Sequence, residues 1–180
     1  MITPGARKSS GPRWKTVHDM SLLFFFMAAL VVALDQVTKK SIVTHFLPNE
    51  SRPVIPHALW LTYVQNQEGA FGLFGTHPLV LAAVALAVVL VFYYWYRQDG
   101  STLLTHVAFG LILGGAIGNI IDRVRFGYVV DFLDLRWWPV FNVADSAISI
   151  GVGLLLLRIL LQDRRASQAQ AQSERSSAEP

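Results

Sequence analysis

The chain has 180 residues, of which 53% are hydrophobic and only 15% are charged, and its mean hydropathy is +0.42. A soluble domain of this size usually carries about a quarter charged residues, so the composition indicates an integral membrane protein. The absence of cysteine excludes disulfide frameworks, thiol nucleophiles and Cys-based metal sites. The net charge of +3 comes from basic residues concentrated in the two tails, which fits a membrane surface, so we expect no nucleic-acid partner.

Residues 1–17 are polar and basic, and they precede an apolar run at 20–34. A cleaved signal peptide and a first membrane anchor share this order. Because comparable apolar segments recur later, we interpret the run as a retained helix. Residues 1–17 are therefore predicted to form a polar cytoplasmic tail.

Three further apolar segments, at 79–96, 103–121 and 144–161, each approach the ~20 residues that cross a bilayer as a helix. The sequence thus predicts an all-α polytopic protein whose four transmembrane helices form a membrane domain at 18–161. Residues 162–180 are rich in Gln, Ser, Ala and Arg without apolar periodicity, and we expect a disordered cytoplasmic tail.

An even number of helices places both termini on one side, and the basic tails predict that this side is cytoplasmic. The connections at 39–78 and 122–140 then face outward, although their own basic residues weaken the charge asymmetry. Residues 59–64 mix aromatic and branched residues in a short alternating pattern before a glycine-rich stretch. This pattern is consistent with a small extracytoplasmic sheet. Trp137, Trp138 and Phe141 lie where interfacial aromatic belts occur.

Ionisable residues near the helix ends are the most informative feature, because each costs about 2.5–3.5 kcal/mol inside a membrane on insertion scales. Asp35, Asn119, Asp122 and Asp145 all lie at the predicted outer ends of helices. Their clustering at one depth predicts a polar site there.

Residue spacing predicts that these side chains point into the bundle. The third apolar segment carries a stripe of small residues that allows close helix approach and leads, four residues on, to Asp122. Asn142, Asp145 and Ser149 share one face of the last helix. The stripe consists of Gly110, Gly114 and Gly118.

Simpler structural interpretations also apply. Asp35 and Lys39, four residues apart, are placed to form a structural ion pair that lowers the insertion cost. Asp122 beside Arg123 is equally consistent with a helix-terminal charge pair and with a site organiser. Asp145 could be an acid favoured by the helix dipole, but its apolar neighbours favour a functional role.

Paired acids indicate a specific chemistry. Two carboxylates held close together share a proton, so that one activates water while the other protonates the polarised oxygen. Residue spacing does not decide whether Asp131 or Asp134 partners Asp145. A proton-coupled transporter and a membrane scaffold are the alternative functions, since inward acids also line ion paths or stabilise bundles.

Five segments, in this order among the apolar spans, resemble the lipoprotein signal peptidase (signal peptidase II) family, a family of membrane aspartyl endopeptidases. In that family the acids of the VDF and FNxAD segments form the catalytic pair, and these match Asp131 and Asp145 here. The resemblance thereby selects Asp131 over Asp134. The segments are DQVTK at 35–39, NQEGAFG at 66–72, GGAIGNIIDR at 114–123, GYVVDF at 127–132 and FNVADSAI at 141–148.

The resemblance also implies four helices with a small extracytoplasmic β cradle in the bacterial inner membrane, with the active site near the outer face. The implied activity is removal of the signal peptide from lipid-modified prolipoproteins, cleaving before the diacylglyceryl-modified cysteine. We expect a monomer in contact with membrane lipid, and no metal or organic cofactor. The family usually has glycine two positions after the asparagine of NQEGAFG, whereas this chain has Glu68. The implied supporting and substrate-binding residues are Asp35, Lys39, Asn66, Asn119, Asp122, Arg123 and Asn142.

Overall fold

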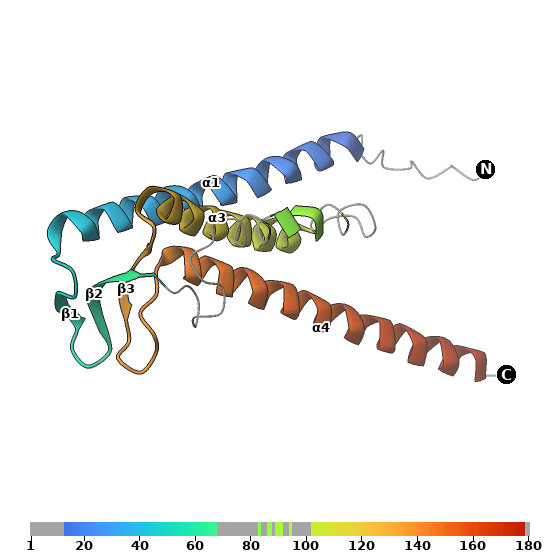
Figure 1. Cartoon of the computed structure of the whole chain (residues 1–180). Coiled ribbons are helices and arrows are strands. Elements are labelled where there is room, and N and C mark those ends of the chain that lie inside the picture. Colours follow the sequence, from blue (N-terminus) through green and yellow to red (C-terminus); the bar gives the residue numbers. More distant parts are fainter. Residues whose placement is uncertain are drawn as a thin grey trace, which may run out of the picture.

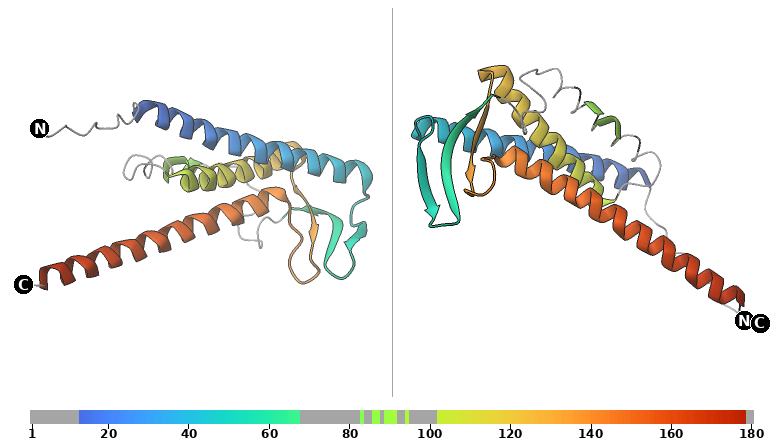
Figure 2. Two further views of the ribbon diagram at one scale, coloured as in Figure 1. Left: turned by 180° about the vertical axis from the view of Figure 1, so that it is seen from behind. Right: turned by 60° about the horizontal axis from the view of Figure 1, so that its bottom comes forward.

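The computed structural model describes residues 13–67 and 102–178, together with the separate positions 83, 86, 87, 89–91 and 94. Its long helices are α1 (Arg13–His45), α3 (Leu103–Phe126) and α4 (Val143–Ala178), and α3 packs against both of the others (Figure 1). A small sheet lies at the end of this bundle that is remote from both termini, as the turned views of Figure 2 also show.

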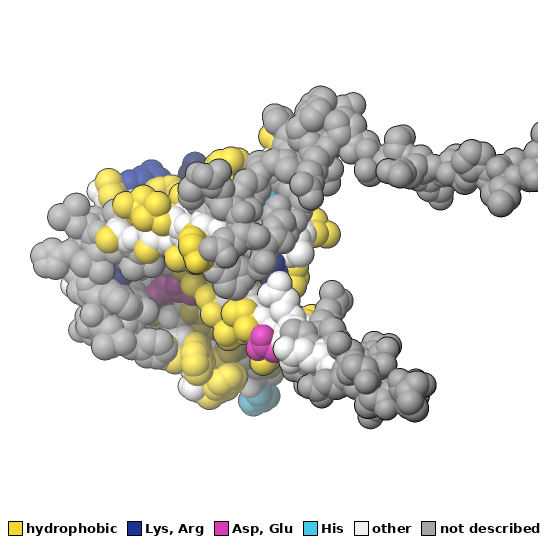
Figure 3. All heavy atoms as spheres, turned by 90° about the vertical axis from the view of Figure 1, so that its right-hand side faces the viewer, with side chains coloured by type: hydrophobic (Ala, Val, Ile, Leu, Met, Phe, Trp, Pro, Cys, Tyr) yellow, Lys and Arg dark blue, Asp and Glu magenta, His cyan; other side chains and the backbone are white. Residues whose placement is uncertain are grey.

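Each of the three helices contains a segment long and apolar enough to cross a membrane, namely Leu22–His45, Leu103–Phe126 and Val143–Asp163. Hydrophobic side chains cover much of the described surface in Figure 3. Three of the four predicted spans therefore correspond to such helices. The fourth, predicted at 79–96, falls largely outside the described residues, although the positions described within it are helical.

Two helices extend beyond their predicted ends. Helix α1 continues to His45, so Asp35 and Lys39 lie inside a helix rather than at its end. Helix α4 continues through Ala178, where the sequence analysis expects a disordered tail. Gln, Ala, Arg and Glu in that segment are good helix formers, and they extend the helix beyond the apolar span. The apolar pattern shows where the bilayer-crossing part ends, not where the helix ends.

The sheet has three antiparallel strands in the order β1 (Ser51–Ile55), β2 (Leu59–Asn66) and β3 (Val129–Asp134). The predicted strand at 59–64 corresponds to β2, whereas β3 was predicted only as part of a connection. Buried side chains pack the sheet against the end of α1 and thus fix its position relative to the helices. These side chains are Ile42, Tyr63, Val130 and Phe132.

The glycine stripe of α3 allows the close helix approach that its spacing predicted, and the helix it contacts is α1. A Cβ atom at Gly114 would lie 2.6 Å from the Ala28 carbonyl oxygen, and one at Gly118 would lie 2.6 Å from Oδ2 of Asp35. The backbones can therefore approach closely only because these positions lack side chains. At Gly118 the missing side chain leaves room for the Asp35 carboxylate between the two helices.

Candidate active site

Lys39 is the centre of a buried ion cluster between α1 and α3. Its Nζ atom lies 2.9 Å from Oδ2 of Asp35 and 2.9 Å from Oδ2 of Asp122, and it donates a 3.0 Å hydrogen bond to Oδ1 of Asn119. The Lys39, Asp35 and Asp122 side chains are at most 3% exposed. Charges this deeply buried are tolerated when each is paired and hydrogen-bonded, as these are.

The two acids of this cluster hold backbone atoms on opposite sides of the site. Asp122 Oδ2 accepts a 3.0 Å hydrogen bond from the amide of Val130, the residue before Asp131. Asp35 Oδ1 accepts a 2.9 Å hydrogen bond from the amide of Ala144, the residue before Asp145. The ion cluster therefore connects α1 to both β3 and the start of α4.

Asp131 projects from β3 into this site and is 2% exposed. Its carboxylate accepts hydrogen bonds from Nδ2 of Asn66 at 2.8 Å and from Nδ2 of Asn142 at 2.6 Å. Burial, reinforced by the negative charge of Asp145, raises the pKa of Asp131 to about 7 despite these two donors. This carboxyl group can therefore hold a proton at neutral pH.

Asp145 lies in the first turn of α4 and is only partly buried. Its Oδ1 accepts a 2.8 Å hydrogen bond from Nδ2 of Asn119, and its Oδ2 accepts a 3.3 Å bond from the backbone amide of Asn142. In return, Oδ1 of Asn142 accepts a 2.9 Å bond from the Asp145 amide. This reciprocal pair caps the helix, so the fold that begins α4 also orients the Asp145 carboxylate.

Asn142 joins the two acids, since its side chain contacts Asp131 and its backbone contacts Asp145. It is fully buried, and its side-chain amide also donates a 3.2 Å bond to Oδ1 of Asn119. A neutral amide held in this way can orient two carboxylates without neutralising either. The arrangement suits a pair of acids that must exchange a proton.

Arg123 supplies positive charge beside both acids. It is 8% exposed and interacts electrostatically with Asp131, Asp145 and Asp122. Its Nε atom is buried and has no acceptor within the described part of the chain. The charge of Arg123, rather than a hydrogen bond from Nε, is therefore its described contribution to the site.

Asp134, the alternative to Asp131, is engaged elsewhere. It accepts 2.7 Å hydrogen bonds from Oγ1 of Thr62 and from the Arg136 amide. Burial tends to raise its pKa, but these bonds and the charge of Arg136 outweigh burial and lower the pKa. Asp134 is therefore an ionised residue of the sheet, away from the Asn142 junction.

Gln36 is a site residue that sequence reasoning missed. Its Nε2 donates to Oδ1 of Asp122 at 2.9 Å and to the Gly118 carbonyl at 3.2 Å. Its position next to Asp35 and three residues before Lys39 is the signal that could have revealed it. Gln36 thus helps to orient the Asp122 carboxylate, which accepts the hydrogen bond from Val130 of β3.

All the site residues predicted from the sequence converge at this end of the bundle through the contacts above, apart from the loop that contains Glu68, which lies outside the described residues. The structure thus describes a helical membrane protein with a buried, acid-rich site beside a small sheet.

A family model described as signal peptidase (SPase) II matches residues 27–161. A lipoprotein signal peptidase of Moorella thermoacetica is 51% identical over 77% of this chain and 93% of its own length. One from Halothermothrix orenii is 42% identical over 79% of this chain and 98% of its own length. The chain therefore belongs to the signal peptidase II family, a family of bacterial membrane proteases.

Solved structures agree with this assignment. Two structures, each described as a bacterial membrane enzyme, superpose with TM-scores of 0.71 and 0.67 at 35% and 36% identity. They cover 81% and 79% of this chain, and 90% and 93% of their own chains. The fold of the described helices and sheet is thus shared with known membrane enzymes.

Proposed function

We propose that this protein is an aspartic endopeptidase that removes the signal peptide from diacylglyceryl-modified prolipoproteins, cleaving before the lipidated cysteine. The observation that carries the proposal is the connection of Asp131 and Asp145 through Asn142, beside helices able to cross a membrane. The names of the relatives support lipoprotein precursors as the substrate class, and the arrangement of the two acids supports the reaction type.

The reaction needs one proton shared between the two acids. Asp145, as a carboxylate, removes a proton from water while the water oxygen forms a bond to the scissile carbonyl carbon. Asp131 donates its proton to the carbonyl oxygen, which gives a neutral tetrahedral intermediate. Collapse of this intermediate breaks the C–N bond. The proton on Asp145 then passes to the leaving amine, and Asp131 recovers its proton from the hydroxyl group.

Other residues position this pair or bind substrate. Asp35, Lys39 and Asp122 fix the backbone on either side of the acids, as the hydrogen bonds to Val130 and Ala144 support. Asn66, Asn119 and Asn142 donate to the carboxylates. We assign Arg123 to a substrate carbonyl or lipid ester oxygen, because its positive charge acts beside both acids.

We further propose that the protein is a monomer of the bacterial inner membrane, with four spans, both termini in the cytoplasm and the site near the outer face. The basic tails and the location of the site at the end of the bundle remote from the termini support this orientation (Figure 1). The division into an N-terminal tail at 1–17, a membrane domain at 18–161 and a polar C-terminal segment at 162–180 belongs to the same proposal.

Cleavage of a purified diacylglyceryl-modified prolipoprotein tests the assignment. Wild type, Asp131→Asn and Asp145→Asn are compared in detergent, each first shown to unfold cooperatively. We expect cleavage by the wild type alone, and Asp134→Asn serves as the control that keeps activity. Near-normal cleavage by either dyad variant would remove that acid from the mechanism, and an inactive wild type would favour the transporter or scaffold alternatives.

A further inference from the structure

The loop between β3 and α4 exposes two adjacent tryptophans outside the apolar spans. Trp137 is 76% exposed and Trp138 is 50% exposed, and their rings meet edge to face at 5.9 Å. Burying such rings is strongly favourable, so the large exposed area of these two rings indicates a surface that is covered in the working protein.

Arg136 connects the loop to the sheet. Arg136 has a φ of 67°, a left-handed conformation that costs a residue with a Cβ about 1 kcal/mol or more. Its guanidinium lies 4.0 Å from the centre of the Trp60 ring, donates a 2.7 Å bond to Oγ of Ser51 and lies 3.5 Å from Oδ2 of Asp134. These contacts stabilise the strained turn, and the turn directs the tryptophans outward.

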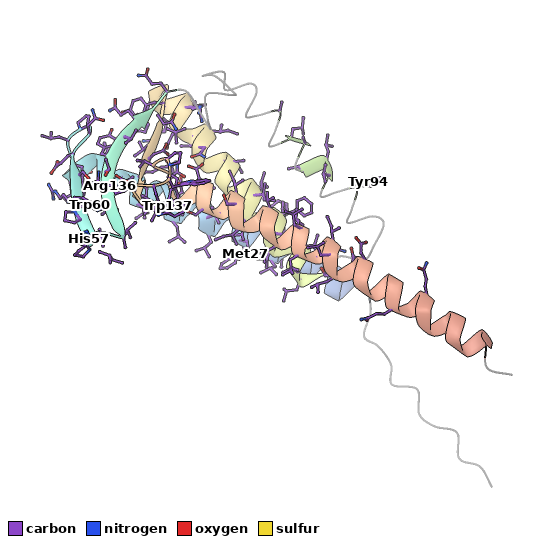
Figure 4. All side chains as sticks on the ribbon, turned by 90° about the horizontal axis from the view of Figure 1, so that it is seen from below. Met27, His57, Trp60, Tyr94, Arg136 and Trp137 are labelled. Carbon is purple, nitrogen blue, oxygen red and sulfur yellow. The ribbon has the colours of Figure 1, made fainter. Side chains whose placement is uncertain are left out.

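The base of the loop is fixed next to the end of a membrane-spanning segment. Phe141 exchanges backbone hydrogen bonds with Leu133, at 3.1 Å and 2.7 Å, and the α4 span begins two residues later at Val143. Trp138 is only five residues from that start, so the loop cannot lie far from the depth at which the span ends. In Figure 4, Trp60, Arg136 and Trp137 lie together beside the strands, with Trp137 nearest to the helices.

We propose that Trp137 and Trp138 insert into the interfacial layer of the phospholipid bilayer and anchor the sheet to the membrane surface. The indole ring, apolar with one N–H donor, suits the glycerol and carbonyl region of lipids. Farther along α4, apolar side chains are again exposed, with Ile150 56% exposed and Val152 44% exposed, and the lipid that covers this span can also reach the loop. Because Arg136 is paired with Asp134, the anchor carries little net charge and should not require anionic lipid.

The anchor would have a mechanical consequence for the site. The loop follows β3 directly, and β3 carries Asp131. Holding the loop at the interface therefore fixes the depth of that strand relative to the bilayer.

Tryptophan quenching by brominated lipid tests the proposal. Trp14, Trp60 and Trp95 are replaced by Phe, which leaves only the loop pair, and the protein is placed in phosphatidylcholine vesicles brominated at shallow or deep acyl positions. We expect shallow bromines to quench most, aqueous iodide to quench little, and added anionic lipid or salt to change neither result. Trp137→Phe should remove more of the lipid quenching than Trp138→Phe, since Trp137 is the more exposed.

Two matched tryptophans calibrate the depth. Leu156→Trp, on the exposed face of the α4 span, should be quenched by deep bromines, and Gln168→Trp, on the polar extension of α4, by iodide alone. If the loop pair behaves like Gln168→Trp, the loop lies in water and the proposal is wrong. The loop tryptophans could instead be shielded from both bromine and iodide, and lose this shielding when excess lipid dilutes the protein in the membrane. That result would show that a second copy of the chain covers the loop, and it would also overturn the proposal. If the triple Phe variant does not fold, the difference between wild type and Trp137→Phe/Trp138→Phe gives the same comparison.

Discussion

Asp35 and Asp122 perform equivalent structural roles on the two sides of the candidate active site. Each accepts a hydrogen bond from the amide of the residue that precedes one dyad aspartate, and Lys39 binds both carboxylates. The buried cation of Lys39 therefore helps to fix the positions of Asp131 and Asp145 relative to each other. The residue spacing suggested only a structural ion pair for Asp35 and Lys39. In the structure, the same cluster also connects β3 to the start of α4.

Lys39→Met should unfold the protein more easily and inactivate it. The substitution leaves two buried carboxylates uncompensated, which costs about 3–5 kcal/mol in comparable cases. The midpoint of thermal unfolding in detergent measures the loss. Lys40→Met, the exposed neighbour on the same helix, is the matched control and should behave as wild type. Adding Asp35→Asn to Lys39→Met should recover part of the stability, and a failure to do so would mean that charge is not the cause.

Asn142→Ala should lower kcat roughly 10- to 100-fold with a smaller effect on KM. It removes the charge-assisted hydrogen bond to Asp131, a kind of bond that contributes about 1.5–3 kcal/mol, and also the neutral bond that caps the helix at Asp145. Steady-state cleavage of the prolipoprotein measures both constants. Ser149→Ala, at an exposed position farther along α4, should change neither. Wild-type kcat in a folded Asn142→Ala protein would contradict the bridging role.

The pH dependence of kcat/KM should report the Asp131 proton. Because burial and the charge of Asp145 raise the pKa of Asp131 to about 7, the shared proton is present below that pH and lost above it, so kcat/KM should fall as pH rises above about 7. Asn66 stabilises the carboxylate form, so Asn66→Ala should move this fall to higher pH. Gln65→Ala, whose side chain donates to Tyr63 and Tyr128 instead, should leave it in place. A shift to lower pH in Asn66→Ala would show that the titrating group is another one.

Asp131→Asn should stabilise the protein while inactivating it. A folded-state pKa of about 7, against the ordinary aspartate value of 3.8, means that ionisation opposes folding increasingly between those pH values. The gain should thus be absent below pH 4 and reach up to about 4 kcal/mol at pH 8. Thermal unfolding at both ends of this range measures it.

Asp134→Asn should change the stability of the protein in the opposite direction. The lowered pKa of Asp134 contributes stability that is present above its unfolded pKa and lost as pH falls through the folded one, so its removal should destabilise the protein at pH 8. Equal effects of the two substitutions would contradict the assigned environments.

Gly118→Ala and Gly153→Ala should differ although both glycines lie in membrane-crossing helices. A Cβ at Gly118 would sit 2.6 Å from Oδ2 and 3.1 Å from Cγ of Asp35, whereas one at Gly153 meets nothing within 4 Å. We expect Gly118→Ala to cost about 1–3 kcal/mol and to lower activity by displacing Asp35. Gly153→Ala should be neutral or stabilising by up to about 1 kcal/mol. Equal melting temperatures for the two variants would contradict the close packing at Gly118.

The sequence by itself determined the class of protein, three apolar spans, one strand and the identity of the polar residues. Long apolar runs and acids beside them carry these signals because the hydrocarbon core of a bilayer accepts apolar side chains and penalises charged ones. The spacing of Gly110, Gly114 and Gly118 correctly predicted a close helix interface. Choosing Asp131 over Asp134 required the family resemblance, because side-chain partners across a sheet leave no trace in local spacing.

Only the tertiary structure decided how these residues meet. Asn142 contacts Asp131 because β3 lies against the start of α4, and Asp122 contacts Val130 because α3 ends beside β3. The role of Gln36 likewise depends on α3, which is remote in the chain. The polar extension of α4 was missed for a different reason, since a segment with no apolar face can still be helical when its residues favour helix. Contacts between distant segments depend on packing and register, which local sequence patterns do not encode.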